Sequence, residues 1–131
     1  MKIISTKVHG ILDYLVGAIL IISPWLLGFS NGQAQTTIPV ILGLAAILYS
    51  IITNYEFGIF KIIPFRIHLI IDALSGILLA SSPWLFGFAD HVYIPHLILG
   101  ILEIVVVLLT KTHTSGNYDS TTVKASFIKN T

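Results

Sequence analysis

The chain has 131 residues, of which 55% are hydrophobic and 10% charged; its mean hydropathy is +0.92 and its formal net charge is +1. A soluble domain of this size needs a more polar surface, so the composition indicates a membrane protein. The sequence contains no cysteine, which excludes disulfides, thiolate catalysis and iron–sulfur clusters, and it has no basic patch that would indicate nucleic acid as a partner.

Four apolar segments approach or reach the roughly 20 residues that a helix needs to cross about 30 Å of hydrocarbon. They cover residues 8–27, 38–53, 67–86 and 94–109. A segment in lipid must satisfy its own backbone hydrogen bonds, so we expect helices. The links are polar (30–37), longer and partly apolar (54–66, expected along the interface) and a tight turn (89–92). The fold class predicted is therefore an all-α, polytopic membrane protein with four transmembrane helices.

The chain is internally duplicated, because residues 7–29 recur 59 positions later as residues 66–88. The informative identities are His9/His68, Asp13/Asp72, Gly17/Gly76, Ser23-Pro24-Trp25/Ser82-Pro83-Trp84 and Gly28-Phe29/Gly87-Phe88. Each repeat carries two helices, and an even number of spans restores the orientation, so the two repeats are parallel. We expect a first repeat over 1–60, a second over 61–111, and a flexible polar cytoplasmic tail over 112–131.

The basic residues predict the topology. Every Lys and Arg lies before the first helix, in the second link or after the fourth helix, and the first and third links have none. By the positive-inside rule both termini are expected to be cytoplasmic.

One end of each repeat carries ionisable residues. His9 and Asp13 share a helical face at a spacing of four residues, and His68 and Asp72 repeat this arrangement. From the helical rise, the two aspartates lie about 9 Å inside the membrane and Glu103 about 12 Å inside. Because buried carboxyl groups are costly in lipid, we predict an intramembrane polar cluster of His9, Asp13, His68, Asp72 and Glu103.

The chemistry of this cluster has three interpretations. Paired histidines and carboxylates suit a structural clasp between helices, and they equally suit a proton relay or a site for a small cation. Two histidines at matching depth also suit a bis-histidine haem or a metal, which makes a redox protein the second hypothesis. An accessory subunit of a larger membrane complex is the third. No hydrolase, P-loop or dinucleotide motif is present, so we expect a non-enzymatic protein, and the sequence leaves any cofactor or metal unknown.

The other end of each repeat carries Ser-Pro-Trp. A proline there removes a backbone hydrogen bond, and the preceding serine can bond the carbonyl that is freed. The tryptophans are expected to anchor the helices at the interface, as are several tyrosines, including Tyr49 and Tyr55. Gly17, Gly76 and Gly100 are expected to permit close helix packing. The interfacial anchors are thus Ser23, Pro24, Trp25, Ser82, Pro83 and Trp84.

The duplicated H-x3-D…SPWL-x-GF pattern, within paired membrane helices, resembles the SPW-repeat family of small prokaryotic integral membrane proteins. The resemblance covers both repeats, from about Lys7 to Lys111, and leaves out the tail. It implies a membrane location and a two-repeat, four-helix protein. We expect a prokaryotic inner membrane as the location, and the lipid bilayer with a second copy or a larger complex as partners. The resemblance implies no activity, so no catalytic residue follows from it.

Overall fold

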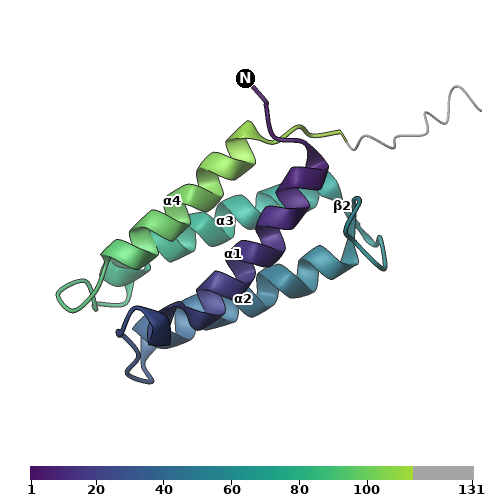
Figure 1. Cartoon of the computed structure of the whole chain (residues 1–131). Coiled ribbons are helices and arrows are strands. Elements are labelled where there is room, and N and C mark those ends of the chain that lie inside the picture. Colours follow the sequence, from purple (N-terminus) through teal and green to yellow (C-terminus); the bar gives the residue numbers. More distant parts are fainter. Residues whose placement is uncertain (114–131) are drawn as a thin grey trace, which may run out of the picture.

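The computed structural model describes residues 1–113, and the predicted tail lies outside this range except for its first two residues. The elements are α1 (Thr6–Leu26), α2 (Ala34–Ile52), β1 (Thr53–Asn54), β2 (Ile63–Pro64), α3 (Phe65–Leu85) and α4 (Ile94–Leu109) (Figure 1). Three of the helices are long and apolar enough to cross a membrane, and α4 is a shorter apolar helix of 16 residues. The prediction of an all-α membrane protein with four helices is confirmed.

The first predicted link is wrong in its bounds. Helix α2 begins four residues early because polar side chains in its first turn satisfy the preceding loop: Gln35 Nε2 donates to the Phe29 carbonyl (2.6 Å), and Thr36 Oγ1 accepts from the Asn31 N–H (2.9 Å). The link after α2 folds back so that β1 and β2 form a short parallel pair, with Thr53 opposite Ile63. Its place along the membrane interface stays a prediction.

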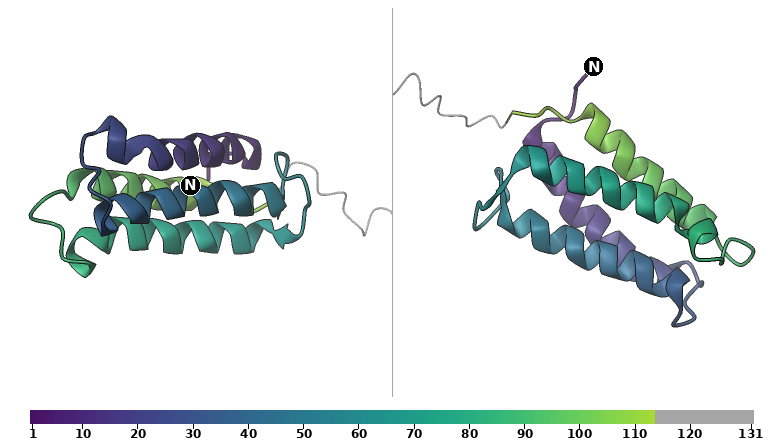
Figure 2. Two further views of the ribbon diagram at one scale, coloured as in Figure 1. Left: turned by 90° about the horizontal axis from the view of Figure 1, so that it is seen from below. Right: turned by 180° about the vertical axis from the view of Figure 1, so that it is seen from behind.

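The helices run side by side along one axis, with the loops after α1 and α3 at one end of the bundle and the β1–β2 link at the other (Figures 1 and 2). Within each repeat the two helices meet at glycines. A Cβ on Gly43 would lie 2.6 Å from the Gly17 carbonyl oxygen, and one on Gly100 would lie 2.5 Å from that of Gly76. These separations are too short for any side chain, so the backbones touch only because both positions lack one.

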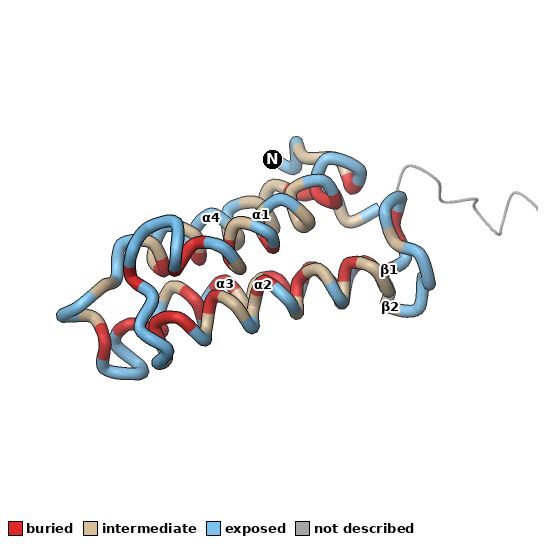
Figure 3. Tube along the Cα trace, turned by 60° about the horizontal axis from the view of Figure 1, so that its bottom comes forward, coloured by how far each residue is buried: buried red, intermediate tan, exposed pale blue. Residues whose placement is uncertain are grey.

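The interior is polar and the exterior apolar. The buried side chains include three histidines, several threonines and serines and one aspartate, whereas large apolar side chains such as Leu48 and Trp25 are 64% and 61% exposed. Figure 3 shows the buried positions along the helix sides that face the bundle interior. In water such a surface would drive aggregation, but in lipid it is the favourable arrangement.

The SPW-L-x-GF pattern ends α1 and α3 by the same set of bonds. Pro24 has no N–H for the Leu20 carbonyl, and the Ser23 hydroxyl donates to that carbonyl instead (3.0 Å). The N–H of Phe29 then bonds the Pro24 carbonyl (2.9 Å), with Gly28 at φ +72°. This is a Schellman ending, in which glycine adopts the left-handed conformation. In α3, Ser82 bonds Leu79 (2.7 Å), and Phe88 bonds Pro83 (2.8 Å).

His96 joins the two SPW ends. Its ring lies between those of Phe29 and Phe88, with centroids 5.1 and 5.0 Å away. Its Nε2 donates to the Gln35 carbonyl (2.9 Å), which is without a helical partner because Pro39 has no N–H. His96 is thus placed at the end opposite the other two buried histidines, where it packs the repeats together.

The serine–proline arrangement predicts a non-additive effect on stability. Ser82→Ala leaves the buried Leu79 carbonyl without a partner and should lower the free energy of unfolding by about 1–3 kcal/mol. In a Pro83→Ala background the restored N–H bonds that carbonyl, so Ser82→Ala should cost far less. Unfolding in detergent micelles measures both effects, and the exposed Ser81→Ala serves as the control. An equal loss of unfolding free energy on Ser82→Ala in the wild-type and Pro83→Ala backgrounds would contradict this account.

Candidate functional site: a buried His–Asp cluster

Four ionisable side chains meet inside the bundle at the end away from the SPW motifs. His9 and Asp13 come from α1, and His68 and Asp72 come from the corresponding turns of α3. The histidines are 1% and 0% exposed, and Asp72 is 7% exposed. Helical periodicity places each His one turn before its Asp, and the facing of α1 and α3 brings the two pairs together. We call these four residues the His–Asp cluster.

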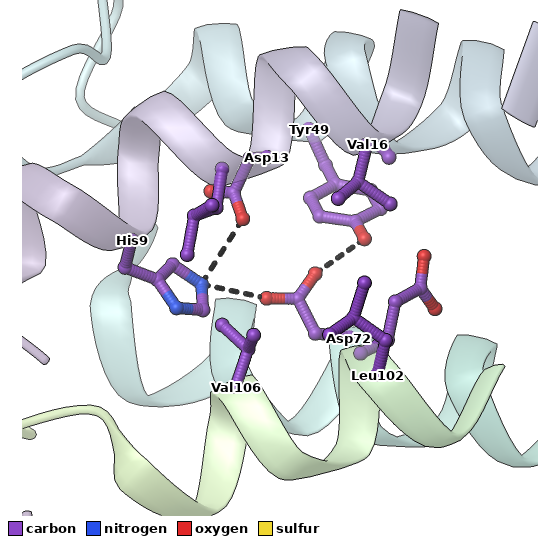
Figure 4. Close-up of a pocket in the computed structure, with 10 residues that line it drawn as sticks. His9, Asp13, Val16, Tyr49, Asp72, Leu102 and Val106 are labelled. Atoms are coloured by element: carbon purple, nitrogen blue, oxygen red, sulfur yellow. Dashed lines mark hydrogen bonds and ion pairs between the residues drawn. The ribbon is translucent and has the colours of Figure 1, made fainter. Parts of the chain in front are cut away.

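Each histidine contacts both aspartates. His9 Nε2 lies 3.1 Å from Asp13 Oδ1 and 3.0 Å from Asp72 Oδ2 (Figure 4). His68 Nε2 lies 3.0 Å from Asp13 Oδ2 and 3.1 Å from Asp72 Oδ2. The pairing therefore runs along each helix and also across the pseudo-two-fold axis, so each repeat supplies half of a shared site.

A threonine hydroxyl holds the far nitrogen of each ring. Thr110 Oγ1 lies 2.9 Å from His9 Nδ1, and Thr53 Oγ1 lies 2.8 Å from His68 Nδ1. Each hydroxyl donates its own proton to the carbonyl four residues earlier, at 2.6 Å in both cases. The oxygen must then accept from Nδ1–H, so Nδ1 carries a proton in both rings and Nε2 is the atom turned to the aspartates.

Two corresponding backbone pairs, one in each repeat, hold the threonines in place. Thr53 and Thr110 follow the second helix of each repeat, and each pairs with the segment that precedes the first helix of the other repeat. Thr53 lies opposite Ile63, and Thr110 forms a parallel bridge with Ile4. Each histidine is thus fixed by a threonine from the opposite repeat.

Hydroxyl groups also support the carboxylates. Tyr49 donates to Asp72, and Asp13 accepts from Tyr55 (3.2 Å) and, more weakly, Ser50 (3.4 Å). Tyr55 lies in the link after β1, where burial and the neighbouring Asp13 carboxylate raise its pKa, so that it remains a donor. The hydroxyls of Tyr49 and Tyr55 thus point into the bundle toward the cluster, whereas interface residues were expected among Tyr14, Tyr49, Tyr55 and Tyr93.

Glu103 lies beside the cluster, at the edge of a small cavity. A cavity of about 30 Å³ is lined by His9, Asp13, Tyr49 and Asp72 together with Glu103 and apolar side chains of α1 and α4. Glu103 Oε2 is buried and has no hydrogen-bond partner among the described residues. The space is sufficient for about one water molecule or ion. The third carboxyl group thus faces the same small cavity as the four clustered residues.

The bis-histidine haem does not fit this geometry. The rings of His9 and His68 lie edge to face with centroids 5.5 Å apart, and two carboxylates fill the space between their Nε2 atoms. A porphyrin bound by both histidines would need that space for its plane. The cavity is also far too small for a macrocycle. The arrangement is suited to a proton or to one small ion.

Sequence reasoning missed the two threonines. The first helices of the repeats correspond at a spacing of 59 residues, but Thr53 and Thr110 are 57 apart, as are Gly43 and Gly100. A repeat comparison at one fixed spacing misses this register. Aligning the second helices separately reveals both pairs.

The threonine bond predicts a measurable loss of stability. Thr110→Val keeps the shape of the side chain but leaves His9 Nδ1–H without its acceptor, at a cost of about 1–3 kcal/mol in unfolding free energy. Thr112→Val, two residues later, is the matched control. Unfolding in micelles is the measurement, and equal losses in both variants would show that the hydroxyl does not hold the ring.

A model of the family described as "SPW repeat domain" matches residues 7–110. This match covers both repeats and all the residues of the cluster. No curated protein and no solved structure matches the chain.

Proposed function

The chain belongs to the SPW repeat domain family, and we propose that it is a non-enzymatic membrane protein that binds a small cation at the His–Asp cluster. The observation that carries the proposal is the reciprocal contact of each histidine Nε2 with oxygens of both aspartates at 3.0–3.1 Å. Since each Nδ1–H already donates to a threonine, an unprotonated Nε2 would turn its lone pair toward carboxylate oxygens. Such a contact is repulsive unless positive charge lies between the atoms.

Charge balance gives the number of protons. Two ionised aspartates carry two negative charges, and a net charge inside lipid costs several kcal/mol. Two protons, one between each Nε2 and the carboxylates that it contacts, make the cluster neutral. In the absence of another cation the cluster therefore holds two protons, shared between imidazole and carboxylate.

The cavity favours exchange over a static clasp. A purely structural cluster has no need of space beside it, whereas here a small cavity meets His9, both aspartates and the buried Glu103 carboxyl. The cavity is lined from α1 by Leu12 and Val16 and from α4 by Leu102 and Val106 (Figure 4). On this side of the cluster, a cation that leaves the four residues would meet the Glu103 carboxyl group.

The proposal includes an orientation. The basic residues gather at one end of the bundle, which holds the N-terminus, the start of α1, the β1–β2 link, the start of α3 and the end of α4 (Figure 1). They are Lys2, Lys7, Lys61, Arg66 and Lys111. The positive-inside rule puts this end, and so the cluster, in the cytoplasmic half of a prokaryotic inner membrane. Each repeat, 1–60 and 61–111, then contributes one His and one Asp from the same side.

Nitrogen NMR of the histidine rings tests the proton content. We expect both ring nitrogens of His9 and His68 to be protonated or proton-sharing at neutral pH, and to lose the Nε2 proton in the Asp13→Asn/Asp72→Asn variant. The exposed His91 is the internal reference.

Exchange separates binding from a clasp. The wild-type signals of His9 and His68 should respond to pH or to added cations while the protein remains folded. Signals that stay fixed until the protein unfolds would show a static clasp and overturn the proposal. Neutral rings without an Nε2 proton in metal-free wild-type protein would also overturn it.

A further inference from the structure

The His–Asp cluster offers four ligand atoms that converge on one point. These are the Nε2 atoms of His9 and His68 and one carboxylate oxygen each from Asp13 and Asp72, all within 4.8 Å of one another. We infer that the cluster is a binding site for a single divalent transition-metal ion, an inference that rests on the proposed cation-binding function and names its cation.

The separations match a tetrahedral site. Zinc-like ions bind histidine nitrogen and carboxylate oxygen at about 2.0–2.2 Å, which gives edges of about 3.3–3.6 Å between neighbouring ligand atoms. Both Nε2 atoms lie 3.0–3.1 Å from Asp72 Oδ2, and Asp13 presents Oδ1 to His9 and Oδ2 to His68 at 3.1 and 3.0 Å. The two edges to Asp72 need to widen by only a few tenths of an ångström, and Asp13 has an oxygen near each histidine.

The threonines orient the histidines as a metal requires. A metal-binding imidazole uses one nitrogen as the ligand and donates the N–H of the other to a fixed acceptor. Thr110 and Thr53 are such acceptors for Nδ1–H, and each is locked because its hydroxyl proton is committed to a backbone carbonyl. The lone pair of each Nε2 therefore points to the centre of the cluster.

The aspartates have outer partners as well. Tyr49 donates to Asp72, and Tyr55 donates to Asp13. Carboxylates that bind metals are commonly hydrogen-bonded in this way, and the bonds leave another oxygen or lone pair free for the ion. All four ligands thus have an orienting hydrogen bond from outside the cluster.

Charge and donor type select the ion. One divalent cation balances two carboxylates, so it replaces the two protons and leaves the site neutral: M²⁺ enters and two H⁺ leave. Two imidazoles with two carboxylates suit Zn²⁺, Co²⁺, Mn²⁺ or Fe²⁺, whereas Ca²⁺ and Mg²⁺ prefer oxygen ligands alone and more of them. Monovalent ions would leave one negative charge unbalanced in lipid.

Cobalt binding to the purified full chain in micelles tests the inference. We expect one Co²⁺ per chain, the visible absorption of a tetrahedral cobalt site, and release of two protons for each ion. Zn²⁺ should displace the cobalt, and excess Mg²⁺ should not. Binding should be lost in the His9→Asn/His68→Asn variant.

The threonines supply the sharper test. Thr53→Val and Thr110→Val keep all four ligands and should each weaken Co²⁺ binding by about 10–100-fold. Thr112→Val should leave it unchanged, and circular dichroism checks that each variant is folded. Equal affinity in the Thr53, Thr110 and Thr112 variants would overturn the orienting role and with it the site described here.

Two further results would overturn the inference. Cobalt that persists in the His9→Asn/His68→Asn variant but disappears on replacing His91 and His113 is adventitious surface binding. If Co²⁺ and Zn²⁺ do not bind at micromolar concentration while the ring NMR still shows exchangeable Nε2 protons, the metal inference fails and the proton-binding function stands. If the ring signals of His9 and His68 also stay fixed until the protein unfolds, both the metal inference and the proposed cation-binding function fail.

Discussion

The reciprocal contact of two histidines with two aspartates is the interaction on which the rest of the structure depends. Each His9 or His68 Nε2 meets the aspartate of its own helix and that of the other repeat. Each repeat alone would leave half of these contacts unmade, and a poorly paired charge buried in lipid costs several kcal/mol. The need to neutralise them makes the two halves one unit, and it fixes the rotation of α1 and α3 about their axes.

The remaining features keep that geometry in place. Glycine contacts join α1 to α2 and α3 to α4, so each repeat is a closely packed pair. Thr53 and Thr110 pass from one pair to the histidine of the other, and His96 joins the two SPW ends at the far side of the bundle. Hydrogen bonds and close packing stabilise the association of the helices, since apolar burial between helices gives little advantage in lipid.

The two ends of the motif treat polar groups differently. At the SPW end each polar group freed by proline finds one partner: serine bonds the Leu20 or Leu79 carbonyl, and His96 bonds that of Gln35. At the cluster, four ionisable groups share contacts around a small cavity, and Glu103 retains a carboxyl oxygen without a partner among the described residues. His96 Nδ1 at the SPW end likewise has no partner within this range, but only the cluster combines such an atom with a converging set of histidines and carboxylates.

The sequence by itself determined the membrane class, the four helices, the duplication and the shared face of each His–Asp pair, because hydropathy and helical periodicity are local properties. It did not determine which residues meet across the axis. Helical spacing defines a face but not the partner that this face meets, so the contacts from α1 to Asp72 and α3 to Asp13, and the inward turn of Tyr49 and Tyr55, came only from tertiary packing. The same packing set the tautomer of both histidines, because the threonines that accept their Nδ1–H come from the opposite repeat.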